Sequence, residues 1–198
     1  MKNLKKLIIL SGVLCFYIHP CYSQINTPLN DSYVIVLDVQ QYWTDKALSK
    51  TDSEGMVKAI NAIIEKTNSD KIIYIKTTAV SKILSVSFKG IHIDTLFAEE
   101  FDKDLRIVND RIFEKKEGDA FTVNELTAFL EQNNAKEIII TGLLAEKCVF
   151  NTGVGGLSRN YDIYLIPEAI GGKSGKSKER AIANLEKKGA KRLKLSDF

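Results

Sequence analysis

The sequence lacks an apolar run long enough to cross a membrane comfortably. Its N-terminal apolar stretch, residues 7–18, is too short for a bilayer-spanning helix. A short basic segment, residues 1–6, precedes this stretch, and Ser23 is a small residue suited to cleavage before Gln24. This arrangement is typical of a secretory signal peptide, so we expect residues 1–23 to be removed. The mature protein would be secreted or periplasmic without stable membrane association, and a retained membrane anchor is the alternative.

Cysteine is also scarce, which excludes an internal disulfide in the mature chain. Of the three cysteines, Cys15 and Cys21 lie in the expected signal peptide, and neither follows the small residue that a lipid-attachment motif requires. Cys148 is therefore the only cysteine expected after cleavage. A lone thiol is a liability in an oxidising compartment, which favours a chemical role for Cys148.

An excess of charge of one sign is missing as well. The whole chain has 28 basic and 25 acidic residues, but residues 1–23 carry three lysines and no acid, so the mature chain is balanced. This balance gives no reason to expect a nucleic-acid partner, and we expect a small-molecule substrate instead.

Residues 24–198 have the composition of a globular protein and the length of a single domain. Runs of Val, Ile and Leu alternate with segments of helical periodicity. This predicts an α/β fold, a three-layer α/β/α, Rossmann-like arrangement with a mostly parallel central sheet. Thr122 would cap one helix, with Glu125 completing a capping box. Strands are expected at 33–39, 71–77, 137–141 and 161–166, shorter strands within 105–113 and 192–195, a hairpin within 83–95, and helices at 53–67, 122–133, 142 to about 159, and 177–188.

Cys148 lies just past the carboxyl end of the expected strand at 137–141, near the start of a helix. Proteins of the α/β class place their ligands beyond the carboxyl ends of parallel strands. The helix dipole also favours a thiolate at this position. The alternative is that Cys148 is a small buried apolar residue, as free cysteines often are.

Two charged residues are expected at the same edge of the sheet. Asp38 closes the first strand, and Lys115 follows a strand that ends near Phe113. Taken singly, Asp38 could be a helix cap or part of a structural ion pair, and Lys115 a solvated surface residue. Together with Cys148 they supply a base, a cation and a nucleophile, which nucleophilic catalysis requires.

These residues and their surroundings resemble the isochorismatase-like cysteine hydrolases, which include nicotinamidases and N-carbamoylsarcosine amidase. The resemblance extends over residues 32–197. Lys116 is the alternative to Lys115 if the alignment is displaced by one residue. The matching residues are Asp38 followed by Gln40, Tyr42 and Trp43, Lys115 followed by Ala120-Phe121, and Thr141-Gly142 followed by Cys148-Val149 and Thr152.

The resemblance implies a mechanism. Asp38 would take the thiol proton of Cys148, the sulfur would attack a carbonyl carbon, and an amine or ammonia would leave a thioester for water to hydrolyse. Lys115 would stabilise the charged groups. The family has a cis peptide before the nucleophile, here Leu143–Leu144, and the backbone N–H groups of Leu144 and Cys148 would form an oxyanion hole. No cofactor is implied, and a homo-oligomer is expected.

Histidine is too scarce for the Asp/His metal site of the nicotinamidase branch. The mature chain has one histidine, His92, which cannot form that site with Asp94 alone. We therefore expect no required metal and place His92 at the surface or the rim of the site. Three aromatic residues, Tyr42, Trp43 and Phe150, are candidates for lining the substrate pocket.

Two glycine-rich segments are explained without a substrate. Gly153, Gly155 and Gly156 lie in the helix after the nucleophile and are expected to pack closely against a neighbouring helix or subunit. Residues 171–177 imitate a phosphate-binding loop, but the first glycine lies one residue too close to the Gly-Lys-Ser triplet. The basic residues within 173–194 could still attract an anionic ligand.

The sequence therefore predicts an exported, cysteine-dependent hydrolase that cleaves a small amide or carbamoyl compound through a thioester. Isochorismate-type ether hydrolysis is one alternative, and it does not need a cysteine nucleophile. A non-catalytic or redox-active binding protein with the same fold is another, and its thiol would be silent toward amides.

Overall fold

The computed structural model of the chain describes the backbone of residues 31–78, 81–87, 90–96 and 100–197. The side chains of the two strands between residues 81 and 96 are not described. The expected signal peptide, residues 1–23, lies outside the described residues. In the described part, no helix is long and apolar enough to span a membrane.

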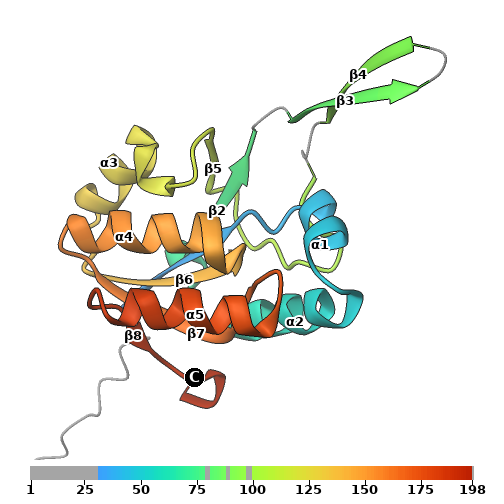
Figure 1. The fold of residues 1–198 in the computed structure, drawn as a ribbon. Coiled ribbons are helices and arrows are strands. Elements are labelled where there is room, and N and C mark those ends of the chain that lie inside the picture. Colours follow the sequence, from blue (N-terminus) through green and yellow to red (C-terminus); the bar gives the residue numbers. More distant parts are fainter. Residues whose placement is uncertain (1–30, 79–80, 88–89, 97–99, 198) are drawn as a thin grey trace, which may run out of the picture.

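Figure 1 shows the helices and strands of the described chain. The helices are α1 (Gln41–Ala47), α2 (Lys50–Lys66), α3 (Asn124–Gln132), α4 (Phe150–Ser158) and α5 (Gly175–Glu186). The strands are β1 (Tyr33–Leu37), β2 (Ile72–Thr77), β3 (Ser81–Ser87), β4 (Gly90–Leu96), β5 (Ile112–Lys115), β6 (Glu137–Leu143), β7 (Asp162–Gly171) and β8 (Lys191–Arg192). There are also 3₁₀ turns at Ser69–Lys71, Ala120–Thr122 and Leu195–Asp197, and a π turn at Ala145–Val149.

Six strands form one parallel sheet in the order β5-β2-β1-β6-β7-β8. Strand β1 has β2 on one side and β6 on the other, so the chain winds outward from β1 in both directions. Ligands of such sheets bind beyond the carboxyl ends of the strands at this switch point. Strands β3 and β4 pair antiparallel as a separate two-stranded sheet, drawn apart from the α/β body in Figure 1. The predicted fold class is confirmed.

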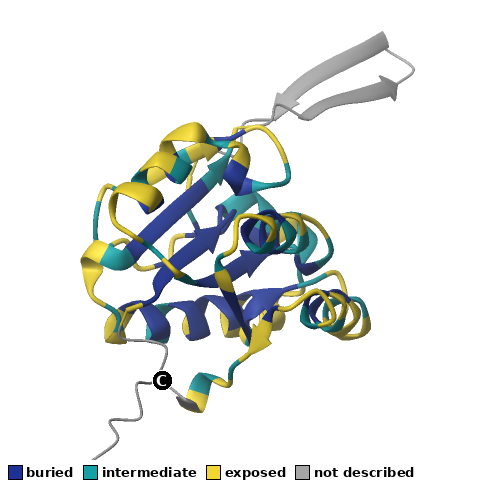
Figure 2. Cartoon of the chain, turned by 90° about the vertical axis from the view of Figure 1, so that its left-hand side faces the viewer, coloured by how far each residue is buried: buried dark blue, intermediate teal, exposed yellow. Residues whose placement is uncertain are grey.

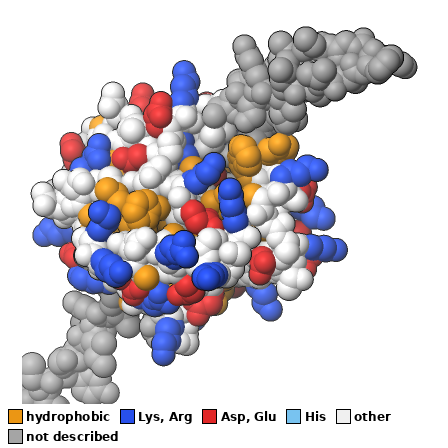
Figure 3. Space-filling view, in the orientation of Figure 1, with side chains coloured by type: hydrophobic (Ala, Val, Ile, Leu, Met, Phe, Trp, Pro, Cys, Tyr) orange, Lys and Arg blue, Asp and Glu red, His pale blue; other side chains and the backbone are white. Residues whose placement is uncertain are grey.

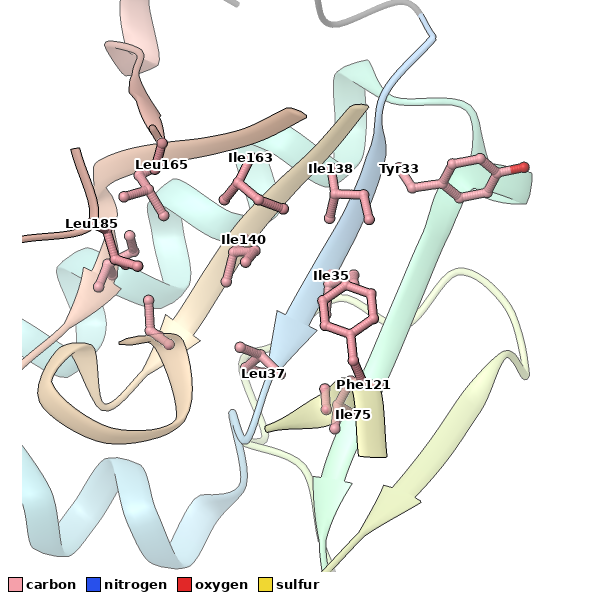
Figure 4. Packing of buried hydrophobic residues seen from close by; sticks show 14 of the residues in the cluster. Tyr33, Ile35, Leu37, Ile75, Phe121, Ile138, Ile140, Ile163, Leu165 and Leu185 are labelled. Carbon is pink, nitrogen blue, oxygen red and sulfur yellow. The ribbon is translucent and has the colours of Figure 1, made fainter. Parts of the chain in front are cut away.

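The strands of the sheet send alternate side chains into two hydrophobic layers. Ile35 and Leu37 of β1 belong to the layer that helices α3, α4 and α5 complete, which Figure 4 shows from close by. Val34 and Val36 belong to the opposite layer, which α2 covers. All five residues of β1 are buried, which explains why its sequence is an unbroken apolar run. Figure 2 shows the buried strands between helices whose outer faces are exposed.

The surface mixes both signs of charge. Figure 3 shows acidic and basic side chains interspersed over one face of the molecule. Hydrophobic side chains gather on this face over α4 and beside α1. The half-buried residues of these helices include Phe150 and Val154 of α4 and Trp43 of α1.

One helix was not predicted, and the predicted start of another differs from the structure. Helix α1 was not anticipated, because Thr44 is the one buried residue among its seven and no side chain caps its start. Helix α3 begins at Asn124, so the predicted Thr122 cap is wrong. The Thr122 hydroxyl donates instead to the carbonyl oxygen of Asp119, whose side chain accepts the Phe121 N–H. The polar cap therefore belongs to the preceding 3₁₀ turn.

Candidate active site

Four neighbouring strands end at one edge of the sheet, and each brings a polar side chain there. Lys115 is the last residue of β5, Thr77 is the last residue of β2, and the two are register partners. Asp38 directly follows β1, and Cys148 follows β6 after a short turn. The structure therefore brings together the three residues singled out from the sequence and adds Thr77 to them.

The backbone turns sharply at Asp38. Its φ of 54° lies in the left-handed region, which aspartate tolerates better than β-branched residues do. Its N–H donates to the carbonyl oxygen of Ile75 at 2.9 Å, which ties the turn to β2. The turn ends β1 at Leu37, earlier than expected, and leaves the Asp38 side chain 5% exposed at the sheet edge. Unusual backbone at a buried charged residue is typical of functional sites.

The turn that carries Cys148 also has special backbone geometry. Gly142 has a φ of 101°, and a Cβ there would overlap the carbonyl oxygen of Leu37. The Leu143–Leu144 peptide bond is cis, as the resemblance implied. The π turn Ala145–Val149 follows and contains Cys148, just before α4. Single π turns are frequent at functional sites.

The Lys115 ammonium group lies at the centre of the site with its side chain 0% exposed. It donates to the Thr77 hydroxyl at 2.7 Å, to the Glu117 carbonyl oxygen at 3.2 Å and to Cys148 Sγ at 3.3 Å. These bonds use all three N–H groups of an ammonium. A buried ammonium requires a counter-charge, which Asp38 Oδ2 supplies at 2.9 Å from Nζ.

The two carboxylate oxygens of Asp38 have different surroundings. Oδ1 accepts a hydrogen bond from the Thr77 hydroxyl at 2.7 Å. Oδ2 is buried and ion-paired with Lys115, but it accepts no hydrogen bond from the part of the chain that the structure describes. Oδ2 therefore keeps a lone pair available for a proton.

The pKa of the Cys148 thiol is raised from its ordinary value of 9.0 to about 11. Burial is the largest cause and the Asp38 carboxylate adds to it, whereas the Lys115 ammonium lowers the pKa by less than these two raise it. At neutral pH Cys148 is therefore a thiol, and a base must remove its proton before the sulfur can attack. The raised pKa means that the resting site holds the thiol, whatever a helix dipole at this position contributes.

A cavity of about 240 Å³ opens onto these groups. Its lining includes Asp38, Thr77, Lys115 and Cys148, so all four side chains meet one space of a size that suits a small molecule. Lys116, the alternative to Lys115, also lines the cavity but is exposed, whereas Lys115 is buried against the other site residues. The geometry therefore favours Lys115 for the role next to Cys148.

Of the three aromatic candidates, Trp43 lines the cavity. Tyr42 lies outside the lining and packs edge-on against Trp43, with ring centroids 4.8 Å apart. Phe150 lies on α4 and packs against the hydrophobic layer beneath it. Residues two apart on a helix point to different sides, which turns Phe150 away from the cavity that Cys148 faces. The predicted pocket role of Tyr42 and Phe150 is therefore not supported.

Comparison with known proteins shows the family. The family model described as the isochorismatase domain matches residues 32–197. The chain belongs to the isochorismatase family. It is 24% identical over 144 residues to the secreted isochorismatase effector Isc1 of Verticillium dahliae, covering 71% of this chain and 73% of that relative.

Solved structures of the isochorismatase family share the fold. An isochorismatase-like hydrolase from Alkaliphilus metalliredigens has a TM-score of 0.65 at 15% identity, over 85% of this chain and 96% of that one. A pyrazinamidase/nicotinamidase from Streptococcus mutans has a TM-score of 0.61 at 18% identity, over 82% of this chain and 99% of that one. At such identities the likeness shows the three-layer α/β/α architecture.

Thr77 is a residue of the site that the sequence pattern did not indicate. Its hydroxyl donates to Asp38 Oδ1 and accepts from Lys115 Nζ, both at 2.7 Å. Gln40 holds the backbone of Thr77 by accepting from its N–H at 2.9 Å and donating to its carbonyl oxygen at 3.2 Å. The one signal in the sequence that could have indicated Thr77 is its position. Thr77 is the last residue of β2, and Asp38 directly follows the neighbouring strand β1.

The nicotinamidase branch of the isochorismatase family implies a metal site. Among the residues that the structure describes, no group of three or more His, Cys, Asp or Glu is placed to hold a metal ion. His92 and Asp94 lie on β4, whose side chains are outside the description. The described donors therefore do not fit a resident metal ion.

The three glycines of α4 pack closely within the chain itself. A Cβ at Gly153 would overlap Leu185 of α5, and one at Gly156 would overlap Ile163 of β7. A Cβ at Gly155 would overlap the carboxylate of Asp119, which caps the 3₁₀ turn before α3. The predicted packing against a neighbouring helix is confirmed for Gly153, whereas Gly155 and Gly156 pack closely against a turn and a strand.

The loop at residues 171–177 binds a carboxylate of the protein itself. Ser174 caps α5 and forms a capping box with Ser177. Glu146, from the π turn, accepts hydrogen bonds from the Lys173 N–H at 2.9 Å and from the Ser177 hydroxyl. The helix N-terminus thus already has an anion, which argues against a phosphate ligand there.

Proposed function

We propose that this member of the isochorismatase family is an exported, cysteine-dependent hydrolase that cleaves the C–N bond of a small amide or carbamoyl compound. One observation carries the proposal. Cys148 Sγ lies 3.3 Å from the Lys115 ammonium, and the same ammonium is ion-paired with Asp38, whose buried Oδ2 accepts no hydrogen bond from the described residues. A nucleophile, a base with a free lone pair and a cation thus share one cavity.

In the first step, Asp38 Oδ2 takes the proton of Cys148 Sγ while the sulfur forms a bond to the carbonyl carbon. The carbonyl electrons move to the oxygen. We place this oxyanion at the backbone N–H groups of Leu144 and Cys148, because both residues line the cavity. Proton transfer during attack suits a thiol with a pKa of about 11, since little thiolate exists at neutral pH.

In the second step, the C–N bond breaks and the protonated Asp38 returns its proton to the leaving nitrogen, which releases an amine or ammonia. Water then gives a proton to Asp38 and attacks the thioester. The C–S bond breaks, the acid leaves, and the sulfur regains the proton from Asp38. Lys115 stays protonated. Its positive charge balances the negative charge, which moves between Asp38 and the sulfur during the reaction.

Ammonia release from a panel of small amides and carbamoyl compounds tests this function. For at least one compound we expect the wild-type rate to exceed that of Cys148→Ser and Asp38→Asn by ~10³-fold or more. Intact-mass measurement after a rapid quench would show an acyl group on Cys148. Folded protein that turns over none of the panel and forms no adduct would support the non-catalytic alternative.

A second candidate is hydrolysis of the enol ether of isochorismate, which the name of the V. dahliae relative favours. That reaction needs no sulfur nucleophile. Cys148→Ala separates the two candidates, because ether hydrolysis would persist in this variant whereas amide hydrolysis would be lost.

Export is supported by the signal-peptide pattern of residues 1–23 and by the secreted description of the same relative. N-terminal sequencing of protein recovered outside the cytoplasm should begin at Gln24. A chain that keeps Met1 and stays with the membrane would point to the anchor alternative.

A further inference from the structure

The cavity beside Cys148 has walls of two kinds. Trp43 and Ala47 of α1, together with Leu143 and Leu144, form an apolar part. The remainder of the lining includes exposed charged side chains from the loop after β5 and from the π turn. A ligand that fills this space would contact both an apolar surface and charges.

The exposed charges of the lining are mainly positive. Asp38 and Lys115 form a buried pair at 2.9 Å and cancel each other. The charges that remain among the described lining residues are Lys116 and Lys147 against the carboxylate of Glu117. Within the described part of the chain, neither lysine side chain forms an ion pair or hydrogen bond, so both remain available to a ligand.

The position of both lysines in the chain keeps them at the site. Lys147 directly precedes Cys148, and Lys116 directly follows Lys115, so each α-carbon lies about 3.8 Å from that of a site residue. Charges that line a partly enclosed cavity are screened less than charges in open solvent. Both lysines therefore act on any charge that a substrate brings into the cavity.

We infer that the substrate carries a carboxylate or a comparable anionic group in addition to its scissile amide. The inference rests on the proposed function for the amide part of the substrate. Lys116 and Lys147 would bind the anionic group, and the wall formed by Trp43 would contact the uncharged body. A neutral amide would leave both lysines without a counter-charge and would bind more weakly.

Alkylation of Cys148 measures this preference without turnover. Iodoacetate and iodoacetamide react with the same thiolate, but the first carries a carboxylate and the second is neutral. The ratio of their rate constants cancels the thiolate fraction and reports how the cavity treats a negative charge. In the double variant Lys116→Met/Lys147→Met at low salt, we expect this ratio to fall about 5- to 10-fold.

Lys136→Met is the matched control, because this exposed lysine precedes β6 at the opposite end of the sheet. It should leave the ratio unchanged. High salt should lower the wild-type ratio toward that of the double variant. An unchanged ratio in the double variant overturns the inference, and so does an equal fall in Lys136→Met.

Succinamate and butyramide extend the test to turnover. Both are primary amides, but succinamate ends in a carboxylate where butyramide ends in a methyl group. The double variant should lose the preference of kcat/KM for succinamate over butyramide, and the ratio is taken within each protein so that any general change in activity cancels. If no amide of the panel is hydrolysed, the proposed function fails while the alkylation ratio still decides the anion preference. The two failures are therefore distinguishable.

Discussion

The hydroxyl of Thr77 lies between the two buried charges of the site. It donates to Asp38 Oδ1 and accepts from Lys115 Nζ, and this leaves Oδ2 to receive the proton of Cys148. We therefore assign Thr77 a positioning role. The sequence pattern could not reveal it, since a threonine at a strand end is an ordinary β-branched strand residue, and the register that pairs it with Lys115 is a tertiary property.

Thr77→Val keeps the shape of the side chain and removes the hydroxyl. We expect kcat to fall about 10- to 100-fold, because losing a hydrogen bond to a charged group costs about 1.5–3 kcal/mol. KM should change less, since the hydroxyl acts on the base. Thr77→Ser restores the hydroxyl and should have a kcat close to that of the wild type. Steady-state kinetics checks this, and equal losses in both variants would indicate a packing role instead.

The pKa of Cys148 can be measured from its alkylation rate as a function of pH. The rate should rise through a pKa of about 11, because the thiolate is the reactive form. Asp38→Asn removes a negative charge that raises this pKa, so the pKa should fall. Lys115→Met removes a positive charge that lowers it, so the pKa should rise.

Opposite shifts in these two variants separate electrostatics from a general loss of packing, which would move both in one direction. Near-UV circular dichroism provides the folding control, because Lys115→Met leaves Asp38 buried without its partner. A wild-type pKa at or below the ordinary 9.0 would contradict the dominance of burial.

At the scale of elements, Glu146 joins the π turn that carries the nucleophile to the start of α5. Its Oε1 accepts from Lys173 and Ser177, and its Oε2 is buried without a hydrogen-bond partner among the described residues. A carboxylate at a helix N-terminus is favoured by the helix dipole. The contact thus fixes two elements that meet at the carboxyl edge of the sheet.

Glu146→Ala should lower the free energy of unfolding by about 1–3 kcal/mol, because two donors lose their acceptor. Glu146→Gln keeps an acceptor oxygen and should lose less. Urea denaturation of the three proteins measures the difference. If Glu146→Ala were as stable as the wild type, the donors of Lys173 and Ser177 would form hydrogen bonds to water that are as favourable as those to Glu146.

The sequence predicted best the elements whose amino-acid composition reflects their burial. Strands β1, β2 and β6 are covered on both faces, so each is a nearly continuous apolar run. Helix α1 has no comparable pattern, because it buries Thr44 alone. The start of α3 was misplaced because the choice of partner by Thr122 depends on a 3₁₀ turn that the pattern does not show.

For the whole molecule, the meeting of Asp38, Lys115 and Cys148 was predictable because the carboxyl ends of parallel strands share one edge. The residues that line the cavity were harder to predict from the sequence. Phe150 was a candidate for lining the cavity, but it packs against the hydrophobic layer and is not among the described lining residues. The raised pKa of Cys148 also depends on burial, which the sequence around the residue does not report.

The proposed chemistry uses no metal ion, and the metal content of the whole protein can be measured to test this. We expect dialysis against a chelator to leave hydrolysis and the melting temperature unchanged, because the described residues offer no group of three donors. Elemental analysis of the purified protein should find less than one metal ion per chain. Loss of activity on chelation, restored by one added metal, would contradict this and revive a nicotinamidase-type site.

The order β5-β2-β1-β6 gathers side chains that lie far apart along the chain. A ribosome adds Asp38, Thr77 and Lys115 before it adds Cys148, and the thiol meets its base only when β6 is inserted beside β1. Nascent, truncated or unfolded chains therefore carry an ordinary solvated thiol. A protein exported before it folds would cross the membrane without catalytic activity, because its thiol meets the base and the cation of the site only after folding at its destination.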